Sequence, residues 1–253
     1  MKTGNRIAVV TGATGGIGFE VAKRLGKDGY TVYLNGINDE EGAKRLKELT
    51  DEGIDAAYYG FDVTNEDAVN ANIKAIGDKH GKIDVVVNNA GGLGGRMRFE
   101  EMTTEFYRGV MALNLDSTFF VSRAAIPYLK KGDNPSIINY TSNAGWNAGG
   151  PGAGIYGTSK AGVHAITRAL AKDLAEYGIR VNAVSPGTID TDFHKQIKTT
   201  KPEVFASWKN NILLGRLGQP EEVAAVVSFL AGPDSSFITA ETIQIGGGQA
   251  LGI

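Results

Sequence analysis

A tyrosine and a lysine four positions apart carry the clearest chemistry in the sequence. Tyr156 and Lys160 lie in GIYGTSKAGVHAITRALAKDL, whose apolar spacing is that of an amphipathic helix, so both side chains are expected on one helix face. A phenol has a reference pKa of about 10, and a neighbouring ammonium favours the phenolate and lowers that pKa. The pair predicts an acid/base site at which Tyr156 donates a proton to a substrate oxygen or removes one.

A serine at a strand end fits the same chemistry. Ser142 closes the apolar run SIINYTS at residues 136–142, and its hydroxyl can hydrogen-bond the substrate oxygen as charge develops on it. A tyrosine and a lysine one turn apart also occur in helices that have no catalytic function. The prediction therefore depends on what surrounds the pair.

A glycine-rich loop follows the first strand-like segment, RIAVVTG at residues 6–12, and leads into a helical pattern. Small residues at such a turn let backbone N–H groups and the helix N-terminus approach a pyrophosphate closely. A purely structural turn would also use glycine. The residues expected to bind the phosphates of a dinucleotide are Gly12, Thr14, Gly15, Gly16, Ile17 and Gly18.

The end of the second predicted strand bears on the identity of the dinucleotide. In many dinucleotide-binding folds an acid about 20 residues after the glycine loop binds the adenosine ribose. Here Asn35 and Gly36 stand in that neighbourhood and no carboxylate does, which favours NADP(H) over NAD(H) because nothing repels a 2′-phosphate. No lysine or arginine stands there to bind the phosphate either. Asp62, at the end of the third predicted strand, is expected at the adenine edge or in a turn.

Alternating strand-like and helix-like segments supply a fold that brings these residues together. The sequence predicts an α/β fold with a doubly wound, seven-stranded parallel sheet of Rossmann type and helices on both faces. We expect one domain over residues 1–253, with 188–217 forming a substrate lid or a plain surface excursion. The strands are expected at 6–12, 31–36, 55–63, 83–91, 136–142, 179–187 and 241–248, and the helices near 16–28, 39–52, 65–80, 103–131, 154–177 and 220–231.

Composition excludes several other classes of protein. A net charge of −2 with 21% charged residues does not indicate a nucleic-acid partner. The absence of cysteine excludes disulfides and thiolate ligands, and the three histidines lack a metal-ligand spacing, so no metal site is expected. No apolar stretch predicts a membrane span or a secretory signal, and a cytoplasmic location is expected.

Taken in order along the chain, these blocks and several others resemble the short-chain dehydrogenases/reductases. The resemblance covers essentially the whole chain and implies hydride transfer between NAD(P)(H) and a carbonyl or secondary alcohol. One interval differs: Ser142 and Tyr156 are 14 positions apart, one more than is usual, with a glycine-rich stretch between them. The blocks are TGATGGIG, Asp62-Val63, NNAG at 88–91, Asn114, Ser142, YGTSK at 156–160, RVNAVSPG at 180–187 and a last strand that ends in Gly-Gly.

The resemblance also implies roles for matching positions. The catalytic residues would be Asn114, Ser142, Tyr156 and Lys160, with Asn114 bending its helix and holding a water in a proton relay to Lys160. Tyr156 and Lys160 would also contact the cofactor at the nicotinamide ribose. Without the resemblance, Asn114 is a polar interruption of a helix and the other blocks are turns. The remaining cofactor contacts implied are Val63 beside Asp62, then Asn88, Ala90 and Gly91 on the adenosine side, and Pro186, Gly187, Ile189 and Thr191 at the nicotinamide carboxamide.

Substrate contacts are expected from loops at the carboxyl ends of the strands, at 92–98, 143–152 and 188–210. Their cations and hydrogen-bond donors favour a small polar substrate such as a sugar, uronate or keto acid. A 3-oxoacyl-thioester (acyl carrier protein) reductase is the alternative, and a catalytically silent cofactor-sensing protein is a second. The family usually forms homotetramers, which we expect here. The polar and aromatic loop residues are Arg96, Arg98, Asn143, Trp146, Asn147, His194 and Lys195.

Overall fold

The computed structural model describes residues 6–192 and 195–249, and its centre is one parallel sheet. The strand order is β3-β2-β1-β4-β5-β6-β7, which confirms the predicted seven-stranded, doubly wound α/β fold. The strands are β1 (Arg6–Val10), β2 (Tyr30–Gly36), β3 (Ala56–Gly60), β4 (Val85–Asn88), β5 (Ser136–Tyr140), β6 (Arg180–Pro186) and β7 (Thr242–Ile245).

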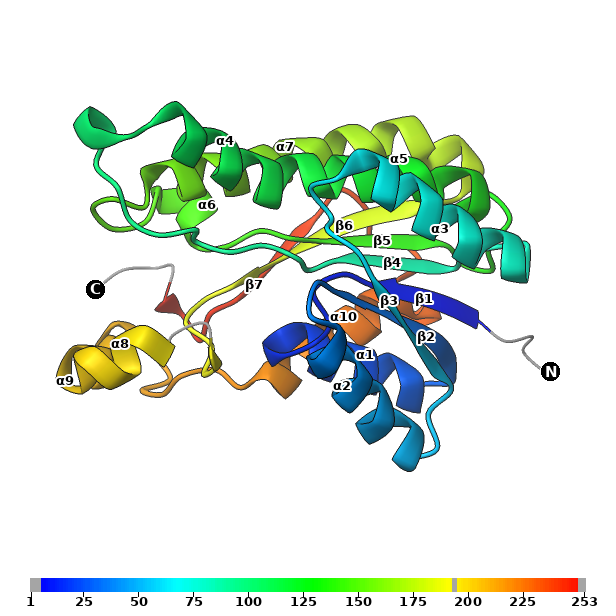
Figure 1. Cartoon of the computed structure of the whole chain (residues 1–253), viewed down its shortest axis with the longest axis horizontal. Helices are drawn as coiled ribbons and strands as arrows, with labels where there is room; N and C mark the ends of the chain where they lie inside the picture. Colours follow the sequence, from blue (N-terminus) through cyan, green and yellow to red (C-terminus); the bar gives the residue numbers. More distant parts are fainter. Residues whose placement is uncertain (1–5, 193–194, 250–253) are drawn as a thin grey trace.

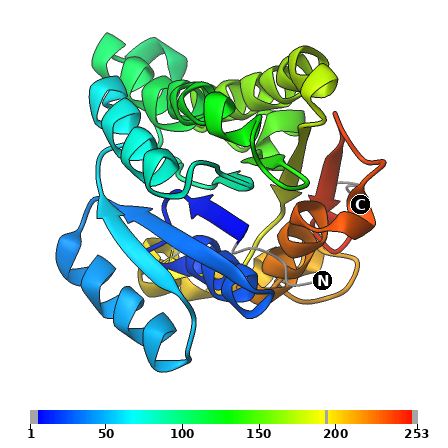
Figure 2. The ribbon, with the colours of Figure 1, turned by 90° about the vertical axis from the view of Figure 1, so that its right-hand side faces the viewer.

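Helices cover both faces of the sheet (Figures 1 and 2). On one face lie α1 (Gly16–Lys27), α2 (Asp39–Asp51) and α10 (Pro220–Ala231). On the other lie α3 (Glu66–His80), α4 (Thr104–Met111), α5 (Ser117–Leu129) and α7 (Gly154–Leu174). The short elements are η1 (Phe99–Glu101), α6 (Ala144–Asn147), η3 (Ala175–Tyr177), α8 (Lys195–Thr200), α9 (Pro202–Ser207), η5 (Trp208–Asn211) and η6 (Pro233–Ser235).

The first strand shows why two helical layers are needed. Its side chains alternate between the faces of the sheet, so Ala8 and Val10 enter one apolar cluster while Ile7 and Val9 enter the other. All four side chains are buried. A strand that is apolar on both faces is stable only when both faces are covered, which is the arrangement of parallel sheets.

The single long helix predicted at 103–131 is interrupted in its middle. Residues Ala112–Asp116 form a π-helical turn, η2, between α4 and α5. The Asn114 side chain donates from Nδ2 to the Val110 carbonyl at 2.9 Å, and an α-helix would pair that carbonyl with the backbone N–H of Asn114 itself. Asn114 therefore alters the helix locally, as the family resemblance implies.

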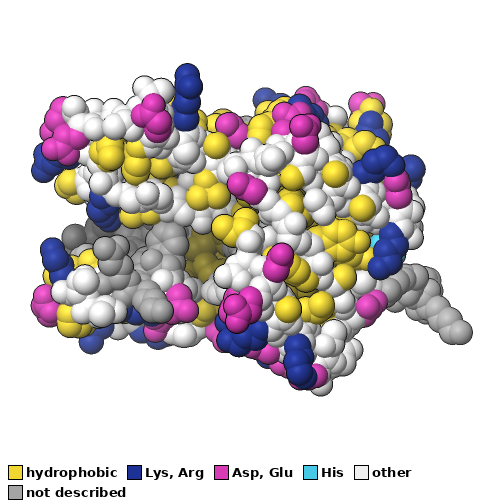
Figure 3. Space-filling view, in the orientation of Figure 1, with side chains coloured by type: hydrophobic (Ala, Val, Ile, Leu, Met, Phe, Trp, Pro, Cys, Tyr) yellow, Lys and Arg dark blue, Asp and Glu magenta, His cyan; other side chains and the backbone are white. Residues whose placement is uncertain are grey.

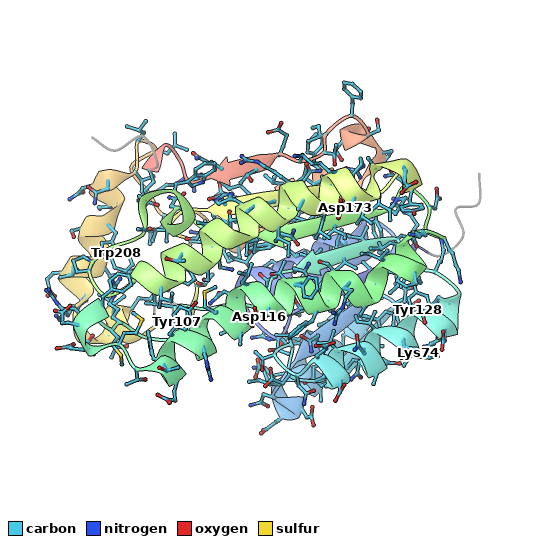
Figure 4. All side chains as sticks on the ribbon, turned by 90° about the horizontal axis from the view of Figure 1, so that it is seen from above. Lys74, Tyr107, Asp116, Tyr128, Asp173 and Trp208 are labelled. Atoms are coloured by element: carbon cyan, nitrogen blue, oxygen red, sulfur yellow. The ribbon has the colours of Figure 1, made fainter. Side chains whose placement is uncertain are left out.

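The strand order reverses between β1 and β4, whose carboxyl ends lie side by side through the pairing of Val10 with Val87. Such a switch point is where doubly wound folds bind ligands. The segment that carries α8, α9 and η5 lies at this end of the molecule. In Figure 4 the labelled Trp208 marks that end, while Tyr128 and Lys74 mark the other.

The surface carries both signs of charge. On the face in Figure 3, lysine and arginine side chains are interspersed with aspartate and glutamate. Within residues 6–192 and 195–249, no helix is both long and apolar enough to cross a membrane.

Candidate active site

A cavity of 1130 Å³ opens at the carboxyl ends of the strands. It joins the glycine loop to the residues with acid/base chemistry, which the sequence places up to 148 positions apart, from Gly12 to Lys160. A volume of this order is that of a site for a large ligand. The predicted residues on its wall are Gly12, Thr14, Gly15, Gly16, Ile17, Gly18, Gly91, Ser142, Tyr156, Lys160, Pro186, Gly187, Ile189 and Thr191.

The glycine loop is shaped by contacts that exclude larger residues. Gly12 has φ +61°, and a Cβ on Gly18 would lie 2.3 Å from the Gly12 carbonyl oxygen. The Asn89 side chain donates to the carbonyls of Thr11 and Gly12, at 3.0 Å each. The loop therefore leads the chain directly into α1, whose first backbone N–H groups have no helical partner. This arrangement fits the pyrophosphate of a dinucleotide.

Asn35 supports the loop from behind. Its Oδ1 accepts from the Gly12 N–H at 3.4 Å, and its Nδ2 donates to the Phe61 carbonyl at 2.8 Å. Asn35 is buried, and neither it nor Gly36 is on the cavity wall. The structure thus gives Asn35 a supporting contact with the phosphate loop in place of the predicted position at the ribose.

Several residues that the resemblance placed at the adenosine side have other partners. Asp62 accepts from the backbone N–H and the hydroxyl of Thr64, both at 2.8 Å, so it forms a turn. Val63 is buried in the apolar core. The Asn88 amide donates to Asn139 at 2.8 Å and to Ser122, and the backbone N–H of Ala90 donates to the Thr11 hydroxyl. None of these four residues is on the cavity wall.

Three charged residues of α2 reach the wall instead: Glu41, Lys44 and Arg45. The Arg45 Nε donates to the Thr14 carbonyl at 3.3 Å and lies 2.9 Å from Glu41, while Nη1 pairs with Glu48 at 2.9 Å. The prediction considered only the end of β2 and so missed them. Their spacing at one helical turn, in the helix after β2, is the signal that could have found them.

Tyr156 and Lys160 lie on α7 as predicted, and Ser142 follows β5 beside them. The Lys160 Nζ lies 5.9 Å from the centre of the Tyr156 ring and donates to the Tyr140 carbonyl at 2.8 Å. Only 3% of Lys160 is exposed, and burial lowers the pKa of its ammonium from 10.5 to about 8. The lysine is thus a partly titrated cation near neutral pH.

The phenol does not behave as the sequence predicted. Burial raises the pKa of Tyr156 above its ordinary value of 10.0, and a hydrogen bond with Ser142 only partly opposes this shift. Burial, and not Lys160, sets the direction of the pKa shift of Tyr156, because moving the phenolate out of water disfavours it. Tyr156 therefore keeps its proton at neutral pH and is arranged to donate it.

Asn114 lies next to Lys160 without reaching the cavity wall. Its Oδ1 accepts from the Gly92 N–H and its Nδ2 donates to the Gly92 carbonyl, both at 2.9 Å. A Cβ on Gly91 would lie 2.8 Å from the Asn114 Oδ1 and 3.0 Å from the Lys160 Nζ. The lack of a side chain at Gly91 is what lets these two polar groups converge.

The predicted substrate loops contribute unequally. Arg96, Asn143 and Asn147 line the cavity, and so do Trp208 and Asn211 of η5. Trp146 stacks on His164 with ring centres 4.3 Å apart, and neither it nor Arg98 is on the wall. His194 lies outside the described residues, and Lys195 begins α8. No group of three or more potential metal ligands occurs in the described part of the chain.

Known proteins share this arrangement over nearly their whole length. A family model described as Enoyl-(Acyl carrier protein) reductase matches residues 12–250. The 3-oxoacyl-(acyl-carrier-protein) reductase FabG of Chlamydia muridarum is 36% identical over 247 residues, which cover 97% of this chain and 98% of that protein.

Two solved structures are similar in fold and sequence. A gluconate 5-dehydrogenase from Burkholderia cenocepacia, in complex with NADP and tartrate, has a TM-score of 0.90 and 29% identity, covering 98% of this chain and 96% of that one. A variant of actinorhodin polyketide ketoreductase with NADPH has a TM-score of 0.90 and 34% identity, covering 97% of each chain.

The glycine loop allows a direct test of its packing. Gly18→Ala should lower the free energy of unfolding by about 1–3 kcal/mol, because its Cβ meets the Gly12 carbonyl. Gly15→Ala is the matched control, since a Cβ there meets nothing within 4 Å and its backbone is extended. Urea unfolding of both variants measures the difference. Equal stabilities would show that the close approach at Gly18 does not constrain the loop.

Proposed function

Because the chain belongs to the short-chain dehydrogenase/reductase family, we propose that it transfers a hydride between NADP(H) and the carbonyl or secondary alcohol of a small polar substrate. The chain is an oxidoreductase that acts on carbonyl or alcohol groups. The observation that carries the proposal is a single cavity lined by the glycine loop, Ser142, Tyr156 and Lys160. The proposal is supported by a glycine loop and a phenol that line the same cavity.

The proton chemistry follows from the geometry. The nicotinamide, when bound, supplies or accepts the hydride at the substrate carbon. In reduction, the Tyr156 hydroxyl donates its proton to the substrate oxygen while the Ser142 hydroxyl donates a hydrogen bond to it. In oxidation, Tyr156 takes the proton from the alcohol. Burial raises the pKa of Tyr156, so the phenol holds its proton at neutral pH and is available as the donor in reduction.

Lys160 and Asn114 support the phenol. When Tyr156 gives up its proton, the buried Lys160 ammonium stabilises the phenolate across a site in which water screens little. Asn114 holds the backbone of Gly92 and lies beside Lys160 at Gly91, so it fixes where the ammonium sits. We propose that these four residues act together in proton transfer.

Removal of one oxygen tests the role of Tyr156. Tyr156→Phe keeps the ring and should lower kcat by about 10²–10⁴-fold while leaving the Kd for the dinucleotide nearly unchanged. Thr158→Val is the control, because Thr158 is an exposed hydroxyl on the same helix that bonds only to the Gly154 carbonyl. Retention of most of the activity by Tyr156→Phe would refute the mechanism.

The preference for NADP(H) is supported by cations near the glycine loop. Lys44 and Arg45 line the cavity, and Arg45 contacts the Thr14 carbonyl. Their neighbour Glu41 also lines it, so the two cations share one carboxylate. The two structural relatives were solved with NADP and with NADPH. We propose that Lys44 and Arg45 bind the 2′-phosphate, which is the role that no residue at the end of β2 can take.

A neutral substitution on α2 tests the phosphate contact. The chain should have a higher kcat/KM with NADPH than with NADH, and Lys44→Gln should raise the KM for NADPH roughly threefold to tenfold with little effect on NADH. Lys47→Gln is the control, since Lys47 pairs with Asp51 on the same helix and is not on the cavity wall. Comparable kcat/KM values for the two cofactors in the unaltered chain would contradict the preference.

A small polar substrate fits the loops above the cavity. Arg96 donates from Nη1 to the Pro151 carbonyl at 2.9 Å and makes no ion pair with another described residue, so it can meet a carboxylate or a hydroxyl. Asn147 and Asn211 add amides to the wall. The acyl-thioester alternative is supported by the relative from Chlamydia muridarum.

A substrate panel separates these readings. With NADPH in excess, we expect the highest kcat/KM for keto sugars, uronates or keto acids, measured by loss of nicotinamide absorbance. A higher kcat/KM for 3-oxoacyl thioesters would establish the alternative. Tight NADPH binding without turnover of any panel member would identify a cofactor-sensing protein.

The assembly proposed is a homotetramer. Phe119 on α5 is 39% exposed and its ring lies 5.9 Å from that of Phe120, which leaves aromatic surface on the outer side of the helix. Phe120 itself packs against the core, so it is the exposed ring of Phe119 that supports burial between copies of the chain.

A further inference from the structure

Gln249 is a polar residue of the cavity wall that the proposed mechanism does not use. It lies in the turn after β7, where its backbone N–H donates to the Gly246 carbonyl at 2.9 Å. Its Oε1 accepts from the backbone N–H of Thr188 at 2.8 Å and from the Asn143 Nδ2 at 3.3 Å, and its Nε2 donates to the Thr188 hydroxyl at 2.9 Å. One side chain thus binds two other segments.

These contacts join three strand ends. Asn143 follows β5, Thr188 follows β6 and Gln249 follows β7. The backbone adds two further links at the same place, from Gly187 N–H to the Ile245 carbonyl at 2.9 Å and from Asn143 N–H to the Pro186 carbonyl at 3.4 Å. Among the described residues, the Gln249 amide is the only side chain that hydrogen-bonds both Asn143 and Thr188.

The space for the Gln249 amide depends on Gly187. A Cβ on Gly187 would lie 2.6 Å from the Gln249 Oε1, 2.8 Å from the Gly246 Cα and 3.2 Å from the Asn143 Nδ2. A larger residue at position 187 would therefore displace the Gln249 amide and break its contacts with Asn143 and Thr188. The absence of a side chain at Gly187 makes room for this contact.

Hydrogen bonds hold the segment 188–190 from two sides. Gln249 binds the N–H of Thr188, while Gly218 donates to the Thr188 carbonyl at 3.1 Å and accepts from the Asp190 N–H at 2.8 Å. The backbone N–H of Ile189, which lies between them, has no acceptor within the described residues. Because N–H groups alternate in an extended segment, it points away from Gly218, and Ile189 lines the cavity.

We propose that Gln249 is a positioning residue for hydride transfer: it fixes Thr188 and Asn143 so that the nicotinamide and the substrate carbonyl meet between them. This inference rests on the proposed function, because it assigns the Thr188 side of the cavity to the nicotinamide half of the cofactor. The glycine loop, which would hold the phosphates and the adenosine half, lies between β1 and α1, and the Gln249 side chain makes no hydrogen bond with it among the described residues. Loss of the Gln249 amide should therefore weaken binding of the nicotinamide half of the dinucleotide and leave binding of the adenosine half unchanged.

Three substitutions at Gln249 separate its hydrogen bonds from its bulk. Gln249→Ala removes both, Gln249→Leu keeps the bulk, and Gln249→Glu keeps an acceptor for the Thr188 N–H and the Asn143 amide. We expect the alanine and leucine variants to lose about tenfold in kcat and to bind NADPH about tenfold more weakly. The glutamate variant should stay within about threefold of the unaltered chain in both.

Adenosine 2′,5′-bisphosphate supplies the readout that a merely structural role would not produce. It carries the adenosine half of NADPH and lacks the nicotinamide, and calorimetry should give the same Kd for it in all variants. Gln244→Ala is the matched control, a glutamine of β7 that is exposed and off the wall of this cavity. Equal weakening of NADPH and bisphosphate binding, or unaltered NADPH binding by the alanine and leucine variants, would overturn the proposal.

The two proposals fail in different ways. A chain that binds NADPH but reduces no carbonyl overturns the proposed function and the hydride-transfer part of the inference, while the ratio of NADPH to bisphosphate affinity still tests whether Gln249 holds the nicotinamide side of the cavity. A chain that reduces carbonyls with NADPH, and whose leucine variant does so at the same kcat and KM, overturns only the inference about Gln249. A chain that does not bind NADPH overturns both.

Discussion

The hydrogen bond from the Thr11 N–H to the Val87 carbonyl, at 3.0 Å, holds the ends of β1 and β4 together where the strand order reverses. The Thr11 hydroxyl adds to it by accepting from the N–H groups of Asn89 and Ala90 at 3.1 and 3.0 Å. The glycine loop continues the chain after β1, and the segment with Gly91 and Gly92 continues it after β4. The glycine loop and the side of the cavity near Asn114 and Lys160 depend on this contact, because one segment leads to α1 and the other to Asn114 and Lys160.

Burial dominates the electrostatics at the acid/base residues. It lowers the pKa of Lys160 to about 8 and raises that of Tyr156, and both shifts disfavour the charged forms. Attraction between the ammonium and the phenolate would oppose both shifts, but burial of each group sets their direction. The two residues are therefore arranged for a charge that appears during proton transfer, when an ammonium fixed by the Tyr140 carbonyl is most effective.

The sequence predicts well what local patterns determine. The apolar run of β1, the glycine loop and the spacing of Tyr156 and Lys160 follow from neighbours within a few positions, and the structure places all three as expected. Asn35 is different, because its side-chain direction is decided by the carbonyl of Phe61, which directly follows β3. The contact of Gln249 with Thr188 joins residues 61 positions apart, and no local sequence pattern predicts it. Contacts between strand ends therefore require the sheet order, which a single sequence supplies only through resemblance.

The extra residue between Ser142 and Tyr156 is accommodated on the substrate side of the cavity. Ala148, Gly149 and Gly152 all have positive φ, so the loop turns tightly and leaves Ser142 and Tyr156 within hydrogen-bonding reach of each other. Two carbonyls of the same loop accept hydrogen bonds: that of Pro151 from the Arg96 side chain, and that of Gly152 from the Met97 N–H at 3.0 Å. The loop is therefore tied to Arg96 and Met97, whereas Tyr156 lies on α7. The fold can alter its choice of substrate at that contact while the acid/base residues stay fixed on α7 and at the end of β5.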